Sequence, residues 1–218
     1  MKHRYLAPAL ALTLTLGLAA TGCTNIENSR DLGDPKVSGT MIARQVCALC
    51  HGVEGRSTSP NFPNLAAQQP AYFIAQMKGF KNHSRMDPPG FEYMWGLSRS
   101  LTDDQIKTLA DYYAAQTPAS PGPAGDPAQE ARGKVIFEKG LSEQKVAACV
   151  ACHGPQAQGS AQFPRLAHQH ADYLVKQLKV FQRTDERPDG SVMKAVAHAL
   201  TSDHMADVTA YLQAMPAP

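Results

Sequence analysis

The motif Cys-x-x-Cys-His occurs twice in this chain of 218 residues, and it restricts the possible folds more than any other feature. The first copy is "CALCH" at 47–51, and the second is "CVACH" at 149–153. On a helix, residues i, i+3 and i+4 lie on one face, so each copy presents two thiols and one imidazole to a single flat ligand. Each half of the chain is therefore expected to fold around whatever that face holds.

The sequence that follows each motif is also repeated. "FPNLA" at 62–66 matches "FPRLA" at 163–167, an offset of 101 residues. Seven further pairs keep offsets of 101 or 99 residues: Tyr72/Tyr173, Gln76/Gln177, Phe80/Phe181, Met94/Met193, Leu101/Leu200, Thr102/Thr201 and Tyr112/Tyr211. Such self-similarity indicates a duplicated domain.

The repeated unit predicts an all-α fold. Thr102 and Gln105 fit a capping box before apolar residues at helical spacing, and Thr201 begins the matching helix of the second copy. The stretches "PAYFIAQMKGF" and "ADYLVKQLKVF" predict shorter helices, and none alternates as a strand would. A unit of roughly 80 residues is small for an apolar core alone, so a bound group is expected to complete it.

The N-terminus is typical of an exported protein. Lys2 and Arg4 precede an uncharged apolar stretch, residues 6–20, which is short for a membrane span and matches a signal peptide. It ends in "AATGC", which resembles the lipobox of bacterial lipoproteins, with Cys23 as the acylated residue. Acylation would account for the odd number of cysteines, five. An ordinary signal peptide, with Cys23 a bystander, is the alternative.

The chain is expected to divide into five parts: a lipoprotein-type signal peptide (1–22), a polar tether (23–37), a first domain (38–117), a linker rich in Pro and Gly (118–129) and a second domain (130–218). The second domain carries an insertion, "EKGLSEQKVAA", before its motif. Loss of the signal peptide would leave 19 basic and 19 acidic side chains. This balance gives no electrostatic case for a nucleic-acid partner.

Three kinds of site use closely spaced cysteines. A redox dithiol usually follows a strand, which is not predicted here, and it does not explain the two histidines. A structural zinc ion needs four ligands close together, which would have to come from both halves and would leave both histidines unused. The third kind is covalent haem, for which Cys-x-x-Cys-His is the attachment signature. We therefore expect two haems, attached through Cys47 and Cys50 and through Cys149 and Cys152, with His51 and His153 on the irons.

The sixth iron ligand decides whether a haem protein binds small molecules or only passes electrons. Met94 and Met193 recur at the same place in both copies, in what the sequence suggests is a loop ahead of the last helix. Methionines there could be core filler, and Met86 is a rival in the first copy. The recurrence favours Met94 and Met193 as axial ligands, since the remaining methionines of the two domains do not recur.

Two prolines are expected to support the histidines. A metal-bound imidazole normally donates its other N–H to an acceptor, which the carbonyl groups of Pro63 and Pro164 could provide; plain turn prolines are the alternative. The histidines without a partner in the other copy are predicted to lie at the surface: His83, His168, His170, His198 and His204. Trp95 adjoins Met94 and could pack on the first haem.

Taken in order, these motifs resemble the dihaem c-type cytochromes of the cytochrome c4 kind, over roughly residues 38–216. The resemblance implies two tandem class I cytochrome c domains about a pseudo-two-fold axis. It also implies His51/Met94 and His153/Met193 ligation, and one-electron transfer between periplasmic or membrane-bound redox partners. The expected lipid anchor departs from soluble members and implies a periplasmic protein tethered to a membrane, with the outer membrane favoured because Thr24 and not Asp follows Cys23.

The sequence thus predicts a general electron carrier that is not itself an enzyme. Two other functions are the alternatives. A cytochrome subunit dedicated to one membrane-side dehydrogenase would have the same sequence features. A dihaem peroxidase also carries two such motifs, but these enzymes are typically longer and keep one haem open to peroxide. The paired methionines argue against that reading.

Overall fold

The structure is a computed structural model, and it describes residues 29–88, 90–183, 187 and 190–216. The predicted signal peptide and Cys23 lie outside these residues. Throughout the described part the regular structure is helical, apart from two isolated bridges, Leu141 with Val146 and Ser160 with Phe163. The predicted all-α class is therefore confirmed.

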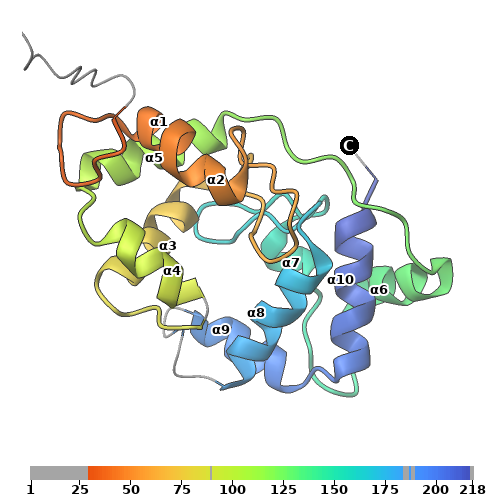
Figure 1. Cartoon of the computed structure of the whole chain (residues 1–218). Coiled ribbons are helices and arrows are strands. Elements are labelled where there is room, and N and C mark those ends of the chain that lie inside the picture. The colour runs from red at the N-terminus through yellow and green to blue at the C-terminus, as the bar shows by residue number, and fades with distance from the viewer. Residues whose placement is uncertain (1–28, 89, 184–186, 188–189, 217–218) are drawn as a thin grey trace, which may run out of the picture.

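Each half of the chain contributes one set of helices (Figure 1). The first half contains α1 (Gly39–Ile42), the π-helical turn η2 (Ala43–Cys47), α2 (Ala48–His51), α3 (Pro70–Lys81), α4 (Gly90–Ser98) and α5 (Asp103–Ala114). The second half contains α6 (Pro127–Lys139), α7 (Val150–His153), α8 (Ala171–Arg183), α9 (Ser191–His198) and α10 (Ser202–Ala214).

The last helix of each half begins where the sequence predicts. Thr102 caps α5 with a full capping box, in which its side chain accepts from the Gln105 N–H and Gln105 bonds back to the Thr102 backbone. Thr201 caps α10 in the same way with His204 as its partner. A capping box satisfies backbone N–H groups that a helix start otherwise leaves unpaired. These two caps fix the start of the helices that close each half.

A glycine lets the first helix of each half approach the last one. A Cβ on Gly39 would lie 2.5 Å from the carbonyl oxygen of Gln105 in α5. A Cβ on Gly133 would lie 2.0 Å from the carbonyl oxygen of Asp207 in α10. Both distances are far below van der Waals contact, so the two helix crossings require residues without a side chain.

The core of each half lies between these crossing helices and the helix that follows the motif, α3 in the first half and α8 in the second. In the first half, ten buried residues form one cluster: Val37, Ile42, Ala43, Phe73, Met77, Leu101, Ile106, Leu109, Ala110 and Tyr113. In the second half, buried residues of α6, α8 and α10 form a matching cluster, which includes Ile136, Phe137, Leu174, Val208 and Leu212. Each half therefore has a core of its own.

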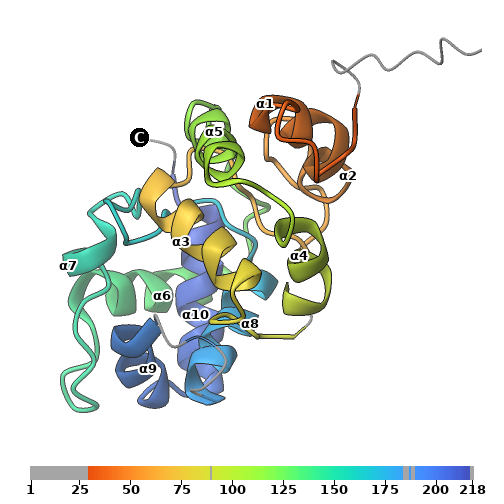
Figure 2. The same ribbon diagram turned by 90° about the vertical axis from the view of Figure 1, so that its left-hand side faces the viewer.

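The two halves lie side by side, with α3 and α8 near the boundary between them (Figures 1 and 2). Polar side chains bridge this boundary, including hydrogen bonds that join residues 97 and 105 positions apart. Within the part of the chain that the structure describes, no helix has the length and apolar character needed to cross a membrane.

Candidate functional site

Each Cys-x-x-Cys-His motif forms a single helical turn at the edge of its core. In the first half, Cys47 ends η2, and Cys50 and His51 lie in α2. Cys50 is exposed, Cys47 is half-buried, and His51 is buried at 7% exposure. The second half repeats this with Cys149, Cys152 and His153, the histidine being 5% exposed. The four cysteines of these motifs are unpaired.

Each buried histidine is held through one ring nitrogen. The Nδ1 of His51 lies 2.9 Å from the carbonyl oxygen of Pro63, and the Nδ1 of His153 lies 2.9 Å from that of Pro164. A carbonyl oxygen only accepts, so Nδ1 must carry the hydrogen, and Nε2 keeps a lone pair. Burial lowers the pKa of both histidines, which favours the neutral imidazole. Both rings are therefore in the form that binds a metal ion.

The loops that carry the two prolines are closed by the same backbone bonds. The carbonyl oxygen of Gly55 accepts from the N–H groups of Leu65 and Ala66, at 2.7 and 3.0 Å. In the second half Ala157 accepts from Leu166 and Ala167, at 2.8 and 3.1 Å. Gly55 has φ +73°, and Ala157 has φ 47°, a region that favours glycine. The fold thus holds both proline carbonyls in one fixed geometry.

The paired methionines lie in helices, and the prediction that they lie in loops is wrong. Met94 is in α4 and Met193 is in α9, and both are half-buried. Met94 packs against the first core cluster, as does Cys47. Met86, the rival candidate in the first half, is 49% exposed. Met94 thus packs against the same core cluster as Cys47, whereas Met86 lies largely at the surface.

The chemistry of these side chains fits a haem attached through two thiols. Burial raises the pKa of the Cys47 thiol and of the Cys149 thiol to about 11, so neither is a reactive thiolate at neutral pH. Within the described residues, no three His, Cys, Asp or Glu side chains gather as a metal cluster. Covalent haem requires two adjacent thiols for attachment and an imidazole with a free Nε2 as an iron ligand.

The histidines outside the motifs only partly follow the prediction. His168 is 5% exposed, and its Nε2 lies 2.8 Å from the carbonyl oxygen of Met215, so its predicted surface position is wrong. His170 is half-buried and contacts the carbonyl oxygen of Ser57 in the other half. His83 and His198 are exposed. Trp95 stacks on Phe91 at 6.1 Å between ring centroids.

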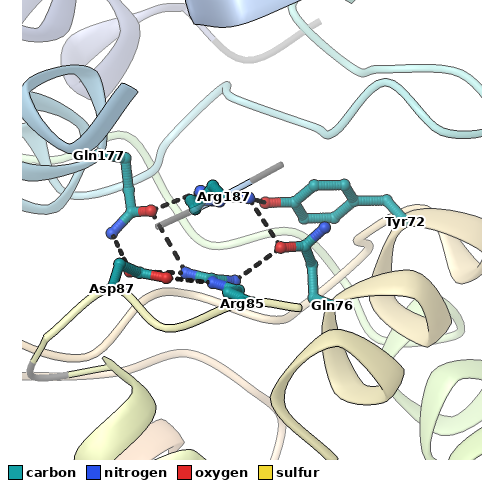
Figure 3. A network of polar contacts seen from close by, with 6 residues as sticks. All are labelled: Tyr72, Gln76, Arg85, Asp87, Gln177 and Arg187. Carbon is teal, nitrogen blue, oxygen red and sulfur yellow. Dashed lines mark hydrogen bonds and ion pairs between the residues drawn. The ribbon is translucent and has the colours of Figure 1, made fainter. Parts of the chain in front are cut away.

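A buried network of polar side chains joins the two halves, and the sequence reasoning did not anticipate it (Figure 3). Arg85 and Asp87 form an ion pair, with Nε and Oδ1 at 2.6 Å and side-chain exposures of 8% and 1%. Gln76 accepts from both Arg85 and Arg187, at 2.8 and 2.7 Å. Gln177 accepts from the same two guanidinium groups. Each arginine also lies over a phenylalanine, Phe80 or Phe181.

Comparisons with known proteins find relatives along most of the chain. A family model described as Cytochrome c matches residues 37–115 and 130–216. The chain is similar to cytochrome c4 of Thiocapsa roseopersicina, at 38% identity over 84% of this chain and 94% of that protein. A thiosulfate dehydrogenase electron acceptor of Stutzerimonas stutzeri is 31% identical over 79% of this chain and 80% of its own length. The solved structure of reduced recombinant cytochrome c4 from Pseudomonas stutzeri superposes with a TM-score of 0.73, at 35% identity over 84% of this chain and 98% of that one.

Proposed function

The chain belongs to the cytochrome c family, within the dihaem cytochrome c4 group, and on this premise we propose which residues hold its two haems. It is an electron carrier with two covalently bound haem c groups, and it is not an enzyme. When bound, each haem supplies an iron that changes between the ferric and ferrous states by one electron. The residues around it set how readily that change occurs.

In the first half, Cys47 and Cys50 would hold the haem through thioethers, and His51 would bind its iron through Nε2. The observation that carries this assignment is the fixed imidazole, whose Nδ1 lies 2.9 Å from the Pro63 carbonyl oxygen while the ring is buried. In the second half, Cys149, Cys152 and His153 have the same roles, with Pro164 as the acceptor. The prolines keep both imidazoles in one tautomer and one orientation.

Met94 and Met193 would supply the second protein ligand of the two irons. A thioether sulfur is a soft ligand that raises the reduction potential. An iron held by both histidine and methionine would offer no position to oxygen or peroxide. Such a site would suit rapid electron transfer between proteins, because its ligands would not change with the redox state.

Absorption spectra of the oxidised protein test this ligation. Two low-spin ferric haems with the near-infrared band of a sulfur-to-iron bond are expected. Carbon monoxide should bind slowly to the reduced protein, because it must first displace a methionine. A high-spin ferric haem in the resting protein would contradict the assignment of Met94 or Met193.

The protein acts on the periplasmic side, as the cytochromes c4 do, and Cys23 attaches it to a membrane. The support for an anchor is the sequence "AATGC" and the polar segment after it. In the described part of this segment, residues 31–36 form turns that precede α1. A Cys23→Ser variant should be found in the soluble periplasmic fraction, whereas the unaltered protein should remain with membranes. The outer membrane is the expected location, and membrane separation on a density gradient would test it.

A second candidate function is service to one dedicated dehydrogenase. Its support is the similarity to a thiosulfate dehydrogenase electron acceptor, which spans 79% of this chain. In that role the haems would accept electrons from an enzyme that oxidises a small sulfur compound. Gentle detergent extraction followed by affinity purification separates the two functions: a stoichiometric dehydrogenase favours the dedicated subunit, and recovery alone favours the general carrier.

A further inference from the structure

The peptide group between Pro63 and Asn64 is engaged at both ends. Its carbonyl oxygen accepts from His51 Nδ1 at 2.9 Å, within the first half of the chain. Its N–H donates to the side-chain Oε1 of Gln169 at 2.8 Å, and Gln169 belongs to the second half. The same glutamine returns a bond from Nε2 to the carbonyl oxygen of Asn64, at 2.9 Å. Gln169 thus holds the backbone of Asn64 through two hydrogen bonds.

The second half contains the equivalent arrangement. The carbonyl oxygen of Pro164 accepts from His153 Nδ1 at 2.9 Å. The N–H of the same peptide, on Arg165, donates to Oε1 of Gln68 at 2.8 Å. Gln68 Nε2 then donates to the Arg165 carbonyl oxygen at 3.2 Å. Each histidine therefore donates to a peptide group whose N–H is bonded to a glutamine of the opposite half.

Both glutamines are fixed in place. Gln68 is 8% exposed and Gln169 is 6% exposed. Each Oε1 also accepts from the N–H of the next residue, Gln69 at 2.9 Å or His170 at 3.1 Å. The positions correspond at the repeat offset of 101 residues. A buried amide with both ends bonded has little freedom to turn away from the opposite half.

We propose that Gln169 lowers the reduction potential of the haem in the first half, through the Pro63–Asn64 peptide group. Gln68 does the same for the haem in the second half, through the Pro164–Arg165 peptide group. An acceptor on the N–H of a peptide group polarises it, so that its carbonyl oxygen accepts more strongly. A stronger acceptor at Nδ1 makes the imidazole a more electron-donating ligand. Such a ligand stabilises ferric iron, so both glutamines hold the reduction potential of the opposite haem down.

This inference rests on the proposed ligation by His51 and His153, and it makes a prediction that crosses the domain boundary. In a Gln169→Leu variant, the equilibrium constant for reduction of the first haem should rise roughly two- to five-fold, which is about 18–41 mV for a one-electron couple. The second haem should change less. Gln68→Leu should do the opposite. Neither substitution changes the net charge, so a uniform electrostatic shift of both haems is not expected.

The measurement is a redox titration followed by NMR, with signals of each haem assigned through its own Cys-x-x-Cys-His segment. Gln69→Leu is the matched control, because Gln69 Nε2 bonds to the Gln158 carbonyl oxygen across the same boundary at 2.9 Å without touching either proline peptide. It should leave both potentials unchanged. A shift of the reduction potentials in Gln69→Leu as large as in the test variants would overturn the proposal. So would a larger shift for the haem in the same half as the substituted glutamine.

A second readout begins with the unaltered protein and uses milder substitutions for comparison. In the unaltered protein, the amide hydrogens of Asn64 and Arg165 should exchange slowly with solvent and should exchange at least ten-fold faster in Gln169→Met and Gln68→Met, respectively. Rapid exchange in the unaltered protein would show that these glutamine hydrogen bonds do not persist in solution. Failure of the ligation itself would appear separately, as high-spin spectra in the unaltered protein. Normal spectra with unshifted potentials would reject only the tuning role.

Discussion

At the scale of single residues, the strongest evidence in the sequence is recurrence. Methionines are common core residues, and only their matching positions in both copies distinguish Met94 and Met193 from the others. The structure adds that Met94 is half-buried against the core cluster that Cys47 also contacts, whereas Met86 is exposed. This difference in environment can be tested by substitution.

Replacing Met94 with Ala should leave one iron with an open or water-filled position. We expect a high-spin signal from one haem of two and a fall in its reduction potential on the order of 0.1 V, within the range of ~0.8 V that axial ligands span. Electronic absorption and redox titration would measure both effects. Met86→Leu is the control, and should leave both haems low-spin. A low-spin Met94→Ala protein would exclude this methionine as a ligand.

Residue identity alone predicted burial poorly where the partner comes from far along the chain. His168 was expected at the surface because it has no counterpart in the first copy, yet it bonds to the backbone of Met215, 47 positions away. Gln68 and Gln169 recur at the repeat offset, so a signal for them existed in the sequence. That recurrence predicts no contact by itself, because an amide side chain in a loop suggests no chemistry until its partner is known.

At the scale of helices, capping and apolar spacing were sufficient to locate the last helix of each half. They were not sufficient for α4 and α9, which are nine and eight residues long. Helices this short gain little stability by themselves, and tertiary packing decides whether they form. The segments around Met94 and Met193 therefore gave no clear sequence signal, although the residues themselves did.

The crossing of α6 and α10 should be sensitive to any side chain at Gly133. We expect Gly133→Ala to lower the free energy of unfolding by about 1–3 kcal/mol, as overpacking does, because the new Cβ would meet the Asp207 carbonyl group. Gly39→Ala should behave alike at the crossing of α1 and α5. Unfolding in denaturant, followed by circular dichroism, measures the change.

Gly96 provides the matched control for both substitutions. It lies in α4, and a Cβ there would meet nothing within 4 Å. Gly96→Ala should therefore keep or raise the stability, by up to about 1 kcal/mol from helix propensity. Equal losses at Gly96 and Gly133 would show that the close helix approach is not the cause.

At the scale of the whole molecule, the sequence predicted two similar units but not how they join. The network of Arg85, Asp87, Gln76, Gln177 and Arg187 draws on both halves (Figure 3). Burial lowers the pKa of Arg85, but its interactions with Tyr173 and Asp87 outweigh that effect and raise the pKa overall. The guanidinium group is therefore charged in the boundary between the halves. No periodicity or motif reports such a contact, because it depends on the packing of two complete domains.

Removing one partner from this network should loosen the boundary. Arg85→Met would leave the buried carboxylate of Asp87 without its ion-pair partner. We expect a loss of about 3–5 kcal/mol in unfolding free energy, or separate unfolding of the two halves, in calorimetry. The exposed pair of Lys107 and Asp111 is the comparison, and Lys107→Gln should leave the transition unchanged. A single, unshifted transition in Arg85→Met would show that other contacts hold the halves together.

The hydrogen bonds that Gln68 and Gln169 make to the opposite half have a consequence for any attempt to divide the protein. Cutting the chain in the linker would give two fragments, each with its own motif and its own apolar cluster. Each fragment would nevertheless expose a backbone N–H that its missing neighbour had satisfied, next to the group that orients its iron ligand. Spectra of an isolated fragment would then describe an altered centre, and the pair of domains is the smallest piece whose redox behaviour represents the intact molecule.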